Sequence, residues 1–179
     1  MSTRSVRPSE EDADSPELTA VQAALTAVQA ALAAEHAAVY GYGLLGGRID
    51  GKRGAEARAA YDGHRARRDA LARAVRDLGG RPVASDAAYA LPFAVADSPS
   101  AVRLAAVLED RIAGVYADLV RAAEGQRRKE AAGALREAAV RAARWRGGNV
   151  AFPGLAERAA GADPAATGPV EAAGADGAR

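Results

Sequence analysis

Apolar residues recur every three or four positions through four long segments of the chain, and this spacing constrains the fold more than any other feature. In the first segment the apolar line runs through Leu18, Val21, Leu25, Val28, Leu32, Val39 and Tyr42. Such steps place these side chains on one face of an α-helix. We therefore predict an all-α fold with helices near residues 17–46, 54–78, 99–124 and 126–146.

Glycine and proline residues mark the ends of these segments. Glycine pairs follow three of the predicted helices, at Gly46-Gly47, Gly79-Gly80 and Gly147-Gly148, where glycine readily takes the left-handed conformation that ends a helix. Ser15-Pro16 and Asp97-Ser98-Pro99 precede two of the helices. A capping side chain followed by proline is typical of a helix N-terminus.

The lengths of the links between the helices predict the topology. The first and third links are short, which favours two antiparallel hairpins. The middle link, residues 79–97, can reach roughly 60 Å when extended, whereas a helix of about 25 residues is roughly 37 Å long. This link can therefore cross the whole bundle and start the third helix parallel to the second. One long crossover of this kind is typical of ferritin-like folds.

The two ends of the chain differ from this core in composition. Residues 1–15 are small and charged, and residues 159–179 are mostly small or polar, so neither end can bury enough apolar surface to fold. We predict disordered tails over 1–15 and 159–179 and one four-helix bundle over 16–158. We find no secretory signal and no apolar run of about 18 residues, so we expect a cytoplasmic protein without membrane contact.

Charge and cysteine content exclude several classes of function. The chain has no cysteine, which excludes disulfides, thiolate metal sites and cysteine nucleophiles. Its net charge of +1 gives no general attraction to nucleic acid or to an anionic membrane. The segment 126–146 carries seven basic and two acidic residues, a net charge of +5. This basic helix could contact nucleic acid or an acidic partner, but we favour a solvated face because Trp145 is its one aromatic residue.

Three short segments resemble a known family. The residues are Ala-Leu-Ala-Ala-Glu-His-Ala-Ala-Val-Tyr-Gly-Tyr (31–42), His64-Arg65-Ala66-Arg67-Arg68-Asp69 and Phe152-Pro153-Gly154-Leu155. They are similar to an uncharacterised bacterial ferritin-like domain family, and the resemblance extends over about residues 18–157. It implies a four-helix ferritin-like fold and implies no activity.

The wider ferritin-like di-metal pattern has one Glu on helices one and three and Glu-x-x-His on helices two and four. Glu35 and Glu109 match the single carboxylates, and His64 matches the histidine of the second helix. Tyr61 stands in place of the accompanying Glu, and the fourth helix has no histidine. The set is too small for a two-metal centre. Glu35, His64 and Glu109 could still hold one divalent iron, manganese or zinc ion.

The alternative is a buried polar cluster of Glu35, Tyr61, His64, Arg68 and Arg111, left over from such a site. A glutamate on an apolar helix face must be paired or neutralised, and Arg68 or Arg111 could pair with Glu35. Arg111 is equivalent to Glu35 when the hairpins are aligned at an offset of 76 residues, which matches Val28 with Leu104. We favour this cluster, with no cofactor, because such charges pair locally more often than they bind ions.

The sequence therefore predicts a non-catalytic ferritin-like bundle that acts by binding or assembly and could form a homo-oligomer. A metal-binding or di-iron or di-manganese oxidase-like protein of the same fold is the alternative. The spacing Gly41-x-Gly43-x-x-Gly46 matches a dinucleotide-binding fingerprint. We reject that interpretation because the glycines end a predicted helix and follow no strand.

Overall fold

The computed structural model describes residues 16–148, and within that range it contains four helices and no strand. They are α1 (Pro16–Leu45), α2 (Gly51–Asp77), α3 (Ser98–Ala122) and α4 (Gly125–Arg146). All four predicted helices are confirmed, with small differences at their ends; α2 begins at Gly51 and not at residue 54. The predicted tails, the Ser15 cap and the segment 152–155 lie outside the described residues.

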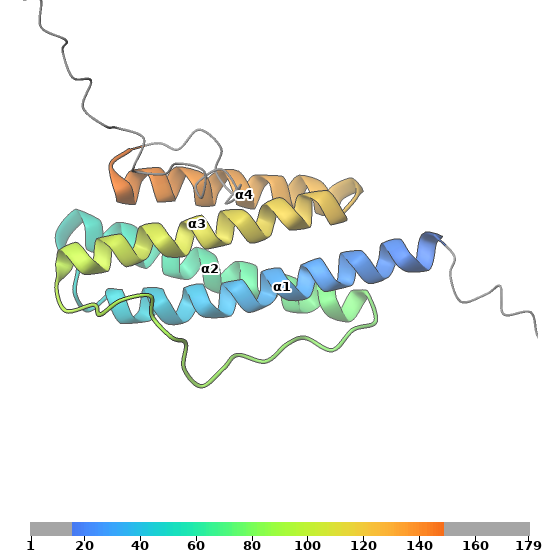
Figure 1. Ribbon diagram of the computed structural model, residues 1–179, viewed down its shortest axis with the longest axis horizontal. Helices are drawn as coiled ribbons and strands as arrows, with labels where there is room; N and C mark the ends of the chain where they lie inside the picture. Colours follow the sequence, from blue (N-terminus) through green and yellow to red (C-terminus); the bar gives the residue numbers. More distant parts are fainter. Residues whose placement is uncertain (1–15, 149–179) are drawn as a thin grey trace, which may run out of the picture.

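The helices form the predicted bundle of two antiparallel hairpins. The pairs α1–α2, α1–α3 and α3–α4 pack against each other. Figure 1 shows that α2 and α3 run in the same direction, and that the link between them returns along the outside of the bundle next to α1. The long crossover between α2 and α3 is therefore confirmed, and it fixes which faces of the four helices meet at the centre.

The crossover is held against α1 by polar and aromatic contacts. The Gln29 side chain donates to the carbonyl oxygen of Arg81 at 2.6 Å and accepts from the Val83 amide at 2.9 Å. Further along α1, the Tyr40 and Tyr89 rings lie 5.4 Å apart. These contacts satisfy backbone groups of a segment that has no secondary structure of its own.

The start of α3 follows from the predicted cap. The Asp97 carboxylate accepts from the Ser100 amide at 2.9 Å, and Ser100 Oγ accepts from the Asp97 amide at 3.1 Å. This reciprocal pair is a capping box, and it explains why the crossover ends at Asp97. At the end of α4, Gly147 has a φ of 76°, which a residue with a side chain rarely adopts.

The interior consists of two apolar clusters with polar side chains between them. One cluster includes Val28, Leu32 and Val75, and the other includes Leu45 and Leu104. Between these clusters the chain buries glutamate and histidine side chains completely. Because burying charge is costly unless it is paired, this central layer is where a functional site is expected.

Helix α1 is the one described helix that is long and apolar enough to span a membrane. By length and composition alone, Pro16–Leu45 could cross a membrane, although a core helix of a soluble protein passes the same test. The qualifying window is 17% buried. Toward its C-terminal end, however, α1 contributes fully buried residues such as Leu32 and Leu45 to the bundle. The absence of membrane contact stays a prediction.

Gly41 has a packing role, and this gives a first prediction. A methyl group added at Gly41 would lie 2.5 Å from Leu108 Cδ1, whereas one added at Gly43 would meet nothing within 4 Å. Gly41→Ala should therefore destabilise the protein by about 1–2 kcal/mol through overpacking. Gly43→Ala should stabilise it by up to ~1 kcal/mol through helix propensity. Urea denaturation of both variants measures the difference, and equal stabilities would contradict the packing role.

Candidate functional site

The structure brings together three of the predicted site residues at the centre of the bundle. Glu35 from α1, His64 from α2 and Glu109 from α3 are each 0% exposed. His64 Nδ1 lies 2.6 Å from Glu35 Oε2, and His64 Nε2 lies 3.2 Å from Glu109 Oε1. The imidazole therefore bridges the two carboxylates, and both of its nitrogens have a carboxylate partner.

Two tyrosine hydroxyls also donate hydrogen bonds to these carboxylates, and each bond joins one hairpin to the other. Tyr42 on α1 donates to Glu109 Oε1 at 2.6 Å, and Tyr116 on α3 donates to Glu35 Oε1 at 2.7 Å. Burial, followed by the adjacent carboxylate charge, raises the pKa of both phenols well above the usual range. Both tyrosines therefore remain protonated hydrogen-bond donors.

Helix α4 supplies a second cation in the form of Arg141. Its Nε donates to Glu109 Oε1 at 2.6 Å, and Trp145 Nε1 donates to the Tyr42 hydroxyl at 3.0 Å. Among the described residues, the buried atoms Glu109 Oε2 and Arg141 Nη2 have no hydrogen-bond partner. We call the six ionisable residues of this layer the central cluster: Glu35, Tyr42, His64, Glu109, Tyr116 and Arg141.

The charges of the central cluster compensate one another. Burial alone would lower the pKa of His64, but its hydrogen bonds to Glu109 and Glu35 outweigh this effect, and the net pKa is raised. Burial alone would raise the pKa of Glu109, but its bonds to His64 and Arg141 outweigh it and lower the pKa. With His64 protonated, two carboxylates face two cations, and the layer is neutral without any further ion.

The residues present do not fit a metal ion. A metal would have to displace His64 from a carboxylate, because both ring nitrogens already lie against one, and of the carboxylate oxygens only Glu109 Oε2 is without a partner among the described residues. The guanidinium of Arg141 would also repel a cation beside Glu109. Within residues 16–148, no group of three or more His, Asp or Glu side chains is arranged to hold a metal. The cluster also exposes no nucleophile, because its members are buried or bonded to one another.

The other residues predicted for the buried cluster lie elsewhere. Arg111 is exposed, and Arg68 pairs with its neighbour Asp69 at 2.7 Å. Tyr61 is half-buried, with the Arg65 guanidinium 5.6 Å from its ring centre. The prediction that Arg68 or Arg111 pairs with Glu35 is therefore wrong. Tyr116 and His64 occupy both oxygens of Glu35 instead.

Two observations could have located the missed partners. Tyr42 and Tyr116 each follow a buried glutamate by seven residues on the same helix, and aligning the hairpins at an offset of 74 residues superposes both pairs. Under that alignment Glu109, and not Arg111, is equivalent to Glu35. The predicted offset of 76 is therefore corrected to 74. For Arg141, the only sequence signal is its place between two alanines of the buried face of α4, Ala138 and Ala142.

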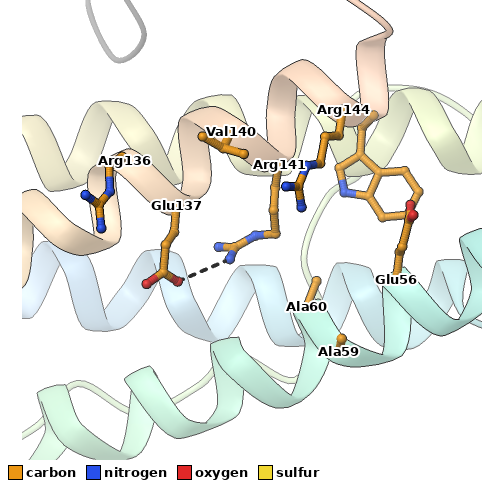
Figure 2. A pocket seen from close by; sticks show the side chains of 9 residues that line it. Glu56, Ala59, Ala60, Arg136, Glu137, Val140, Arg141 and Arg144 are labelled. Atoms are coloured by element: carbon orange, nitrogen blue, oxygen red, sulfur yellow. Dashed lines mark ion pairs between the residues drawn. The ribbon is translucent and has the colours of Figure 1, made fainter.

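A cleft next to the central cluster opens between α2 and α4 (Figure 2). Its volume is about 400 Å3. Arg141 connects the two sites, since its Nε contacts Glu109 inside the bundle and its Nη1 lies 3.6 Å from Glu137 at the cleft. The cleft is lined by Glu56, Ala59, Ala60, Arg136, Glu137, Val140, Arg141, Arg144 and Trp145.

Comparison with known proteins identifies relatives without an assigned activity. The family described as Domain of unknown function (DUF4439) matches residues 27–157. Among solved structures, the chain is similar to a conserved hypothetical protein, rv2844, from Mycobacterium tuberculosis. The identity is 34% and the TM-score is 0.67, and the match covers 70% of this chain and 96% of that one. No protein of curated function matches the chain.

Proposed function

The chain belongs to the family described as Domain of unknown function (DUF4439), and from this premise we propose that it is a non-catalytic ferritin-like bundle that acts by binding or assembly. The ferritin-like assignment is supported by the single long crossover and by the carboxylates that α1 and α3 contribute at the centre of the bundle. In this proposal the central cluster is a structural remnant of a metal site, in which His64 and Arg141 supply the positive charge.

One observation carries the proposal: the His64 imidazole lies between Glu35 and Glu109, with both ring nitrogens engaged. A buried charge is tolerated only when it is paired and hydrogen-bonded. In the central cluster the pairing is internal, so the layer needs no ion to be stable. The oxidase-like alternative requires open coordination positions, and the geometry does not favour it.

Metal loading of the purified protein tests this proposal. We expect that excess iron(II), manganese(II) or zinc(II) will neither remain bound in stoichiometric amount after desalting nor raise the melting temperature. A ligand that binds only the native state at 100 times its Kd adds about 2.7 kcal/mol of stability, so binding would be detected. Stoichiometric uptake that Glu35→Gln abolishes and Glu130→Gln preserves would overturn the proposal, because Glu130 is an exposed residue on α4.

Two substitutions at Glu35 test its structural role. Glu35→Gln should be mild, because the amide keeps the shape: its oxygen can accept from His64 while its NH2 group donates to the Tyr116 hydroxyl oxygen. Glu35→Ala should cost more, on the order of 1–3 kcal/mol, because it leaves those buried donors without a partner. Calorimetry of both variants measures this difference. Equal losses for the two variants would show that charge, and not hydrogen bonding, is the dominant contribution of Glu35.

A further inference from the structure

The cleft between α2 and α4 has the size and the apolar surface that a small molecule would need. Its volume of about 400 Å3 lies within the range of ligand pockets. Ala59 and Ala60 form part of the α2 wall, and their short side chains leave space opposite α4, as Figure 2 shows. On the α4 side, Val140 is 44% exposed and Trp145 lines the cleft. The walls therefore offer apolar contacts to a ligand.

The positive charge of the four helices is concentrated on the two that border this cleft. Helix α2 has eight basic and four acidic residues, and α4 has seven basic and two acidic residues, which give net charges of +4 and +5. Helix α1 has two acidic residues and no basic one, and α3 has three of each. The overall charge of +1 therefore hides a basic face that attracts anions.

Two arginines on α4 are available to an anion at the cleft. Arg136 and Arg144 are exposed and line it, and among the described residues neither forms an ion pair. They lie eight residues apart on one helix face, about 12 Å along its axis, with Val140 between them. Of the other charges in the lining, Arg141 pairs with Glu109 and Glu137 pairs with Arg67. Arg136 and Arg144 therefore face Glu56 alone, which leaves a surplus of one positive charge. That surplus matches a ligand with a single negative charge.

We propose that the α2–α4 cleft binds a small organic carboxylate that has an apolar body. The carboxylate pairs with Arg136 or Arg144, because the planar guanidinium matches a carboxylate with two parallel hydrogen bonds. The apolar body lies against Val140, Trp145 and the alanines of α2. The inference rests on the proposed binding role, but its site is the cleft and not the central cluster. A failure to bind the carboxylate can therefore be told apart from metal uptake by the central cluster.

Trp145 is a built-in reporter of the cleft, because it is the only tryptophan of the chain. We would titrate the full-length protein with decanoate below its micelle concentration and follow Trp145 fluorescence. Acetate has the charge without the apolar body, and decanol has the chain without the charge. We expect a saturable response to decanoate, and at least tenfold weaker responses to acetate and to decanol.

Paired variants identify the residues that bind the anion. Arg136→Gln combined with Arg144→Gln should weaken decanoate binding about tenfold or more. Arg127→Gln combined with Lys129→Gln removes the same charge from α4 outside the cleft, and should change binding less than threefold. Glu137→Gln should tighten binding, because it removes a negative charge from the lining of the cleft. Thermal melts of each variant verify that the bundle is intact.

Three results would overturn the inference. The first is no saturable Trp145 response to millimolar decanoate in the intact protein. The second is equal weakening by the cleft pair and the control pair of substitutions, which would indicate only a general charge effect. The third is a saturable response to a single-stranded oligonucleotide with none to decanoate, which would assign the basic face to nucleic acid.

Discussion

Replacing Glu109 by alanine should lower the free energy of unfolding by about 3–5 kcal/mol, the largest effect we expect from a single substitution. Glu109 Oε1 accepts hydrogen bonds from Tyr42, His64 and Arg141 at 2.6, 3.2 and 2.6 Å. Without the carboxylate, the imidazolium and the guanidinium share Glu35 as the one fully buried counter-ion, and Arg141 keeps only its 3.6 Å contact with the exposed Glu137. Urea denaturation near pH 6 measures the loss of stability.

Glu109→Gln separates the charge of Glu109 from its hydrogen bonds. Oε1 accepts all three bonds while Oε2 has no partner among the described residues, so an amide oxygen at the Oε1 position can keep every bond. The glutamine variant should therefore be more stable than the alanine variant, and its remaining deficit measures the lost charge. Glu130→Ala, at an exposed position of α4, should change stability by no more than about 0.5 kcal/mol. An alanine effect at position 109 as small as this surface control would contradict the role of Glu109.

The helices and their topology could be predicted because their signals are local. The spacing of apolar residues, the Asp97 cap and the length of the link 79–97 each depend only on neighbouring sequence. They were sufficient to predict that α2 and α3 are parallel. The start of α2 was misplaced because Gly51 and Gly54 both suit a helix boundary, and the sequence does not distinguish between them.

The buried carboxylates and His64 could be predicted because a polar residue on an apolar helix line is conspicuous. Their partners were harder to find. Tyr42 lies on the apolar line of its helix and Tyr116 beside the apolar stripe of α3, where a tyrosine is usually interpreted as a packing residue. Their hydroxyl groups bond across the hairpins, and such contacts depend on the relative rotation of α1 and α3, which no local signal specifies.

The error at Arg111 has a geometric cause. Aligning the hairpins at an offset of 76 residues instead of 74 shifts the match by two positions. In an α-helix two residues correspond to a rotation of about 200°, so the match moved from the buried face of α3 to the solvent face. Glu109 is accordingly buried and Arg111 exposed. Apolar residues alone could not fix this alignment, because alanine and leucine recur on every helix.

The stability of the protein should decline as pH rises above neutrality, and His64 should be a cause. The pKa of His64 is raised above 6.5 in the folded state, so its stabilising contribution is complete below about pH 6.5 and is lost as pH rises through the folded pKa. The pKa of Glu109 is lowered from 4.5, so its contribution is present above pH 4.5 and is lost as pH falls. The central cluster should therefore stabilise the fold most between these two values.

Substituting each of the two histidines in turn tests this assignment. In urea denaturation from pH 5.5 to 9, loss of one proton can reduce stability by at most about 1.4 kcal/mol per pH unit. His64→Gln should be less stable than the wild type at pH 5.5, and the difference should shrink toward pH 9. His36→Gln is the matched control, since His36 lies outside the central cluster and the bond described for it is to the Val83 carbonyl oxygen at 3.3 Å. A difference between wild type and His64→Gln that stays constant across this range would mean that His64 is neutral in the folded protein. The charge balance that replaces a metal in the central cluster would then be absent.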